Sequence, residues 1–148
     1  MKIEKQVLSI EQMKHLQELG VDTSDASMYW VRAKRITGEQ KNNCIDRDMG
    51  KWKLSLSKSM VLPAAWALES VPTYTIGDLI EKLPKNIDGS CLLIEFCASD
   101  LGYGDWDCGE SYGINAQQKF NDKSLKEALY DLLCWVAEKH KELLNKND

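Results

Sequence analysis

The segment YTIGDLIEKLP, residues 74–84, predicts a short helix that divides the chain into two strand-rich halves. Thr75 is placed as its N-cap, and Asp78 follows three residues later, which is the spacing of a capping box. Leu79 begins an apolar face that recurs at helical spacing. Pro84 cannot continue the helix. A helix at this place separates one predicted hairpin from another.

Two more helices are predicted at the two ends of the chain. Ser9 and Gln12 form a second capping box, and the helix that they start ends at Gly20. Near the C-terminal end, Ser124 is the predicted N-cap and Glu127 is its N3 partner. This longest helix carries an apolar stripe at helical spacing, made of Leu125, Leu129, Leu132 and Val136.

Strands are predicted between these helices. Residues 27–36 are β-branched and aromatic, and residues 51–60 alternate apolar and polar side chains, as a half-exposed antiparallel strand does. Residues 90–99 and 106–115 are predicted to form a second hairpin. The sequence does not decide whether residues 61–70 form a strand or a helical turn, because they contain a proline, which disfavours a central strand, and are short for a helix.

The predicted order is therefore helix, hairpin, helix, hairpin, helix. Antiparallel hairpins with helices on one face predict an α+β fold, in which the two hairpins form a sheet with three helices. The length of 148 residues fits one globular domain that spans 1–148. A hydrophobic fraction of 43% and a charged fraction of 28% are typical of such a domain.

The cysteines and the apolar runs predict a cytoplasmic protein. The five cysteines are an odd number and form no C-x-x-C pair, which favours reduced thiols. The N-terminal residues MKIEKQVLSIEQM contain no apolar core of a signal peptide. No apolar run approaches the roughly 18 residues that a membrane-spanning helix needs, so no membrane contact is predicted.

Three segments carry a resemblance to a known group of proteins. They are SIEQMKHLQELGVDTSDASM (9–28), VPTYTIGDLIEKLP (71–84) and LKEALYDLLCWVAEK (125–139). In this order and spacing they resemble uncharacterised short α+β proteins encoded in prophages and mobile elements of gut Bacteroidales. The group has no assigned activity, so the resemblance transfers no functional residue. It implies a cytoplasmic, phage-associated accessory protein.

An acidic loop is the first candidate site. Asp100, Asp105, Asp107 and Glu110 lie close together in the sequence, and carboxylates at alternate positions are ligands that Ca²⁺ prefers. The spacing does not match an EF-hand loop. The alternative is the tip of an ordinary hairpin, with glycines that supply positive φ. The hairpin is the favoured interpretation, and a metal site or metal-dependent enzyme remains the alternative.

A basic region is the second candidate. Between residues 30 and 60, eight basic and three acidic residues give a balance of +5, which leaves −9 for the rest of a chain of net charge −4. Lys34, Arg35, Lys51, Lys53 and Lys58 are candidates for binding nucleic acid. The chain as a whole is acidic and carries no nucleic-acid motif. A solvated strand face that discourages edge-to-edge aggregation is therefore favoured over nucleic-acid binding.

The sequence predicts an interaction protein and no enzyme. No set of residues matches a catalytic triad, a P-loop, a zinc site or a dinucleotide fingerprint, so no cofactor is predicted. The predicted partner is an unidentified protein, a second copy of the chain among the possibilities, since stretches of opposite charge can meet between copies. Trp66 and Leu68 are the candidate apolar contacts.

Overall fold

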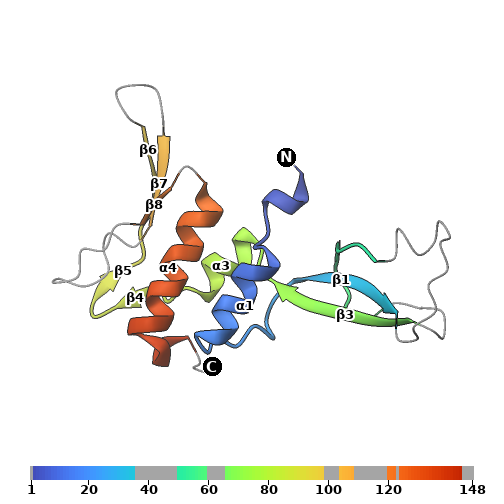
Figure 1. Ribbon diagram of the computed structural model, residues 1–148. Coiled ribbons are helices and arrows are strands. Elements are labelled where there is room, and N and C mark those ends of the chain that lie inside the picture. Colours follow the sequence, from blue (N-terminus) through green and yellow to red (C-terminus); the bar gives the residue numbers. More distant parts are fainter. Residues whose placement is uncertain are drawn as a thin grey trace.

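The computed structural model describes residues 2–35, 50–59, 66–98, 104–108, 120–122 and 124–144. Its helices are α1 (Ile10–Glu18), α3 (Ile76–Lys82) and α4 (Leu125–Lys139), with the 3-10 turns η1 (Ile3–Lys5) and η2 (Lys141–Leu143). Figure 1 shows the three α-helices together at the centre of the molecule, with strands on both sides of them.

The strands form three antiparallel sheets. The first contains β1 (Met28–Arg35), β2 (Lys53–Ser55) and β3 (Trp66–Thr73) in the order β2-β1-β3. The second pairs β4 (Asn86–Ile87) with β5 (Ser90–Cys91). The third contains β6 (Ile94–Ala98), β7 (Gly104–Cys108) and β8 (Phe120–Asp122) in that order.

The predicted α+β class and the order of helices and hairpins are confirmed. The first hairpin pairs β1 with β2, and the second pairs β6 with β7, and the two belong to separate sheets. For the second half of segment 61–70, the structure shows a strand, because Trp66 begins the eight-residue strand β3. Residues 61–65 lie outside the described part of the chain.

The hydrophobic core lies among the three helices. Its fully buried members come from all of them and from the segments next to α1 and α3, and they include Leu8, Met13, Leu16, Tyr74, Leu79, Leu129, Leu132 and Leu133. Both predicted capping boxes at the N-terminal ends of α1 and α3 are present. The local start signals therefore place two apolar helix faces against the stripe of α4.

The third predicted capping box is wrong. Ser124 is the N-cap residue of α4, but its side chain makes no capping hydrogen bond. The Glu127 carboxylate instead accepts a hydrogen bond of 2.8 Å from Nε2 of Gln12 in α1. Gln12 belongs to the α1 capping box through its Oε1 atom, which accepts from the Ser9 N–H at 3.0 Å. One amide side chain thus closes α1 and ties it to α4.

The helix α1 ends in a Schellman motif. The N–H of Val21 donates to the carbonyl of Leu16 at 3.0 Å, and the N–H of Gly20 donates to Gln17 at 2.9 Å. Gly20 has a φ of 85°, which favours glycine. The chain reverses here and passes to the loop before β1.

No helix within the described ranges is both long and apolar enough to cross a membrane.

Candidate interaction surface

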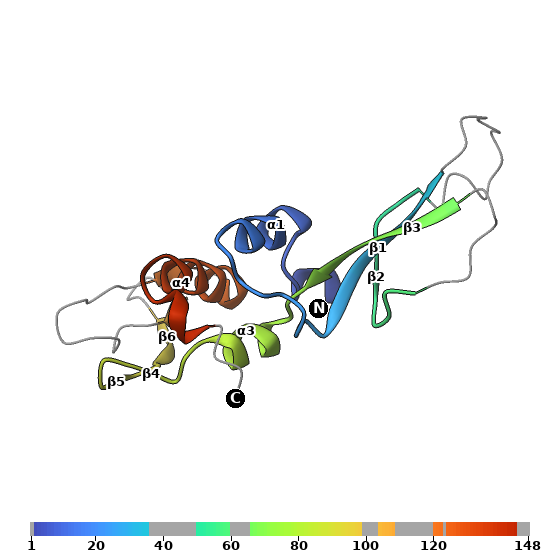
Figure 2. The same cartoon turned by 90° about the horizontal axis from the view of Figure 1, so that it is seen from below.

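The sheet β2-β1-β3, called the arm below, extends away from the three helices. Both Figure 1 and Figure 2 show β1 and β3 leaving the helical centre side by side, with the sheet β6-β7-β8 on the opposite side of the helices. β1 and β3 pair along their whole length, from Met28 opposite Thr73 to Arg35 opposite Trp66. The arm is thus a continuous ladder joined to the core at one end.

Strand pairing assigns the arm residues to two faces, because directly opposed residues of antiparallel strands share a face. The first is called the Trp30 face, and it also holds Leu54, Glu69 and Val71, together with Arg32 and Lys34. The second is called the Val31 face, and it holds Tyr29, Ala33, Lys53, Leu68 and Ser70. Val31 and Ala33 are buried although they lie outside the main core cluster.

The side chains of the Trp30 face hold one another in place. Nε1 of Trp30 donates to the Leu8 carbonyl at 2.9 Å, which fixes the indole to the core. Further along β1, the Arg32 guanidinium lies 4.6 Å from the ring centre of Trp52 and donates to the Glu69 carboxylate at 2.8 and 2.9 Å. Both indoles are half-buried and engaged within the protein.

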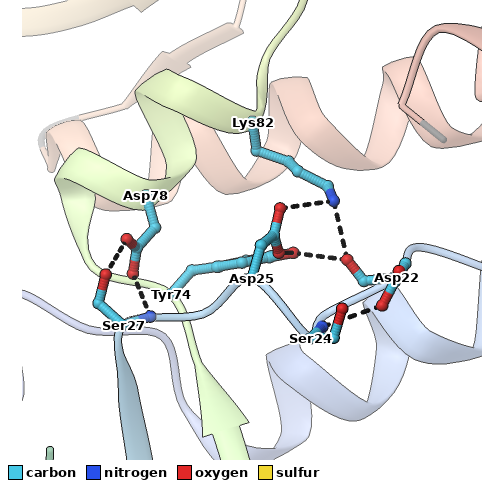
Figure 3. A network of polar contacts seen from close by, with 7 residues as sticks. All are labelled: Asp22, Ser24, Asp25, Ser27, Tyr74, Asp78 and Lys82. Carbon is cyan, nitrogen blue, oxygen red and sulfur yellow. Dashed lines mark hydrogen bonds and ion pairs between the residues drawn. The ribbon is translucent and has the colours of Figure 1, made fainter. Parts of the chain in front are cut away.

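A carboxylate clamps the base of the arm, where β1 begins and β3 ends (Figure 3). Asp78, in the first turn of α3, accepts from the N–H of Ser27 at 3.2 Å and from its hydroxyl. The same carboxylate accepts from the N–H of Thr75 at 2.9 Å. Ser27 directly precedes β1, and Thr75 lies two residues after the end of β3. One side chain therefore fixes both strands relative to α3.

Tyr74 adds a second contact at this base. The ring is fully buried, and its hydroxyl donates to Oδ1 of Asp25 at 2.6 Å and to the Asp22 carbonyl at 2.9 Å (Figure 3). Lys82 donates to the same two residues, at 2.9 Å to the Asp25 carboxylate and at 2.8 Å to the Asp22 carbonyl. This network joins the loop before β1 to α3.

Burial, reinforced by the Asp25 carboxylate, raises the pKa of Tyr74 far above its usual range. The phenol therefore stays protonated, and its one proton serves two acceptors, to both of whose residues Lys82 also donates. A hydrogen bond from the Ser24 N–H lowers the pKa of Asp22. The Tyr74 network thus acts as a structural clamp between the loop before β1 and α3.

This network is not predicted by any local pattern in the sequence. Its members lie in two segments far apart in the sequence, the polar loop 22–27 and the helix start 74–82. Asp78 was recognised as half of a capping box, but its second role toward Ser27 depends on a contact across 51 positions of the chain. The signal that the sequence does offer is Tyr74 itself, because a tyrosine next to an apolar helix face is often buried and its hydroxyl then needs a hydrogen-bond partner.

The basic candidates are divided among different positions on the arm. Lys34 belongs to the Trp30 face and Lys53 to the Val31 face. Arg35 is the last residue of β1, whereas Lys51 and Lys58 lie beyond the two ends of β2 and are exposed. The structure does not bring these five residues onto one face.

The two acidic candidates that the structure describes, Asp105 and Asp107, lie in β7, on the opposite side of the helices from the arm. In the strand register, Asp105 is opposite Cys97 and Asp107 is opposite Glu95 of β6. Asp100 and Glu110 lie outside the described residues. Within the described part of the chain, no three His, Cys, Asp or Glu residues are grouped so as to hold a metal ion.

The two interface candidates both lie in β3. Trp66 is its first residue, and Leu68 is a half-buried residue opposite Ala33. In the sheet order β2-β1-β3, this strand is at an edge. The structure thus brings Trp66 and Leu68 together on one edge strand of the arm.

Comparison with known proteins gives no relative. No protein-family model matches the chain, and no curated protein and no solved structure shows significant similarity to it.

Proposed function

We propose that this chain is a cytoplasmic, non-enzymatic interaction module that contacts a protein partner through the arm. The observation that carries the proposal is the position of the arm, an ordered sheet that leaves the helical core and is joined to it at one end (Figures 1 and 2). In a phage-associated setting, which the sequence resemblance implies, such a chain is an accessory protein.

The clamp at the base supports this role. Asp78 and the Tyr74 network fix the direction in which β1 and β3 leave the core. A binding element that is fixed before it meets its partner loses less conformational entropy on binding. Rigidity at the base and an extended sheet beyond it are what a preorganised binding arm requires.

The side chains of the arm favour protein over nucleic acid as the partner. Stacking on bases needs free aromatic faces, whereas Trp30 and Trp52 are partly buried against the core and Arg32 lies over the ring of Trp52. Binding to a phosphate backbone needs clustered cations, whereas Lys34 and Lys53 lie on opposite faces. The free thiols of Cys91 and Cys134 agree with a reducing compartment.

The test compares two charge reversals on the same background. Lys53→Glu changes an exposed side chain of the arm, and Lys14→Glu changes an exposed side chain of α1. A protein that the tagged chain captures from its source cells is purified, and its Kd for each variant is measured by interferometry. We expect Lys53→Glu to weaken binding at least about tenfold, or 1.4 kcal/mol, and Lys14→Glu to leave it unchanged.

The opposite pattern would refute the arm as the binding surface. Retardation of DNA or RNA at low salt, lost on adding salt, would assign nucleic acid as the partner instead.

A further inference from the structure

We propose that the partner strand of the arm is β3 of a second copy of this chain, which joins two arms into one continuous antiparallel sheet with the strand order β2-β1-β3-β3-β1-β2. This inference rests on the proposed function, because it takes the arm as the interaction surface. It goes further in naming the occupant and the residue at the symmetry axis.

The outer edge of β3 is open from Trp66 to Ser70 in the described structure, whereas at the Thr73 end the chain is covered, because Val7 and Leu8 pair with Thr75 and Tyr74. β3 pairs with β1 on one side, and no strand among the described ranges pairs with its other side. Such an open edge presents unpaired N–H and C=O groups, which are a template for another strand. Antiparallel pairing of a strand with its own copy is two-fold symmetric, so one surface supplies both halves of the contact.

Pro72 shows which backbone groups point outward. Pro72 has no N–H and lies opposite Tyr29, so this pair is a non-hydrogen-bonded one, in which both backbones point away from each other. Bonded and non-bonded pairs alternate along an antiparallel ladder. Leu68 and Ser70 therefore direct their N–H and C=O groups to the outer edge, while Glu69 and Val71 bond to β1.

The register follows from Pro72 and Glu69. A two-fold axis at Ser70 would place Pro72 opposite Leu68 of the copy and lose a bond in each of these symmetric pairs. An axis at Glu69 would oppose two carboxylates directly, which is destabilising. An axis at Leu68 avoids both, because it pairs Leu68 with its copy and Ser70 with Trp66, and leaves Pro72 beyond these pairs.

The side chains agree with the Leu68 axis. On the Val31 face, the two Leu68 residues are adjacent, so an apolar pair lies at the centre of the contact. On the Trp30 face, Ala67 is opposite Glu69 of the copy, which leaves the ion pair of Glu69 with Arg32 intact. No residue of like charge is opposed within these pairs.

The first measurement is the mass of the full chain by sedimentation equilibrium over a wide concentration range, under reducing conditions. We expect a monomer–dimer equilibrium. Ser70→Pro removes an outward N–H and no bond to β1, so it should weaken the dimer at least about tenfold. Ser70→Ala, the matched control, should keep the dimer. Circular dichroism melting verifies that both variants fold.

The second measurement locates the axis. Under mild oxidation, Leu68→Cys should form a disulfide between its two copies, since opposed residues of a bonded pair have Cα atoms about 5.5 Å apart. Ser70→Cys should not, because its opposite residue is Trp66. Peptide mass spectrometry identifies the linked peptides, and the wild-type chain controls for its own cysteines.

A wild-type chain that is monomeric at every concentration would overturn the inference, and so would a dimer that is insensitive to Ser70→Pro or not linked through Leu68. If such a monomer still loses its captured partner on Lys53→Glu, the proposed function stands and only the second copy is wrong. If the dimer forms as expected but the captured protein still binds the Lys53→Glu variant, the β3–β3 dimer stands and the arm as the binding surface for that protein is wrong.

Discussion

The carboxylate of Asp78 in α3 accepts a hydrogen bond from the N–H of Ser27, the residue directly before β1, at 3.2 Å. The same carboxylate oxygen, Oδ2, also accepts from the N–H of Thr75, just after β3, at 2.9 Å. A capping box normally serves one helix. Here it also fixes the two strands that enter and leave the arm, so helix initiation and the direction of the arm depend on one side chain.

Replacement of this carboxylate should loosen the arm at its base. We expect Asp78→Ala to lower the free energy of unfolding by about 1 to 2 kcal/mol, because a capping interaction and bonds to Ser27 are lost together. Hydrogen exchange should accelerate at the amides of Ser27 and Thr75. Glu81→Ala, an exposed residue of the same helix, is the matched control. Equal unfolding energies and exchange rates for the two variants would contradict the clamp.

The Tyr74 hydroxyl should contribute to stability in a pH-dependent way. Tyr74→Phe removes the donor to Asp25 and Asp22 and should cost about 1 to 3 kcal/mol near neutral pH. Burial raises the folded-state pKa of Tyr74 above the value near 10 of an unfolded chain. The folded state therefore retains a proton that the unfolded state loses above pH 10, and stability falls as pH rises from there.

Urea unfolding between pH 8 and pH 11 checks this linkage. Above the pKa of an unfolded tyrosine, the free energy of unfolding should fall with pH less steeply in Tyr74→Phe than in the wild type, by up to about 1.4 kcal/mol per pH unit. Burial also raises the pKa of Tyr130. Because Tyr130 is present in both proteins, part of the loss of stability at high pH should remain in Tyr74→Phe. Identical slopes for wild type and variant would exclude Tyr74 as a source of the pH dependence.

Substitution by alanine should destabilise the protein by different amounts at the two described glycines that have positive φ, Gly20 and Gly89. Gly20 and Gly89 have φ of 85° and 86°, so both substitutions strain the backbone by about 1 to 2 kcal/mol. A Cβ at Gly20 would also overlap the end of the Lys141 side chain, which would have to move away, whereas nothing lies within 4 Å of a Cβ at Gly89. We therefore expect Gly20→Ala to lower the melting temperature more than Gly89→Ala.

The Lys141→Ala background separates the backbone strain of Gly20→Ala from its steric overlap with the Lys141 side chain. In that background, Gly20→Ala should cost about as much as Gly89→Ala, because only the backbone strain remains. A Gly20→Ala penalty that is unchanged by Lys141→Ala would show that the lysine moves aside freely.

The two described free thiols should differ in reactivity. Cys91 is exposed, whereas burial raises the pKa of the half-buried Cys134 from 9.0 to about 11. The thiolate fraction of Cys134 at pH 8 is then about a hundredfold lower than that of an ordinary thiol. Iodoacetamide labelling followed by peptide mass spectrometry should modify Cys91 first in the native chain, and both residues in urea. Equal native rates would contradict the burial of Cys134.

The local parts of the fold were predictable from the sequence. Ser9 and Thr75 announce their helices because a capping box needs only residues three positions apart. The first hairpin was predictable from alternation in residues 51–60. Ser124 shows the limit, because the same pattern is present but Glu127 is bonded to Gln12 in a distant helix. Local spacing cannot reveal such competition.

The pairing of β1 with β3 was not predictable. Residues 61–70 carry a proline and a weak pattern, and their strand is defined by its partner in β1 and not by their own composition. For the same reason the sequence grouped Lys34 with Lys53, which the register places on opposite faces. Trp66 and Leu68 were named as apolar contacts, yet the edge position of β3 appears only in the sheet order.

The last pair of the β1–β3 ladder is Arg35 opposite Trp66, so the chain leaves β1 and returns to β3 at the same place. The segment between these two residues contains β2 and Trp52, so the same stretch of chain that joins β1 to β3 also covers the second side of β1. Because β1 is the central strand of the order β2-β1-β3, loss of β2 would turn β1 into an edge strand. Deletion of residues 53–55 would therefore create a second template for strand addition on the arm.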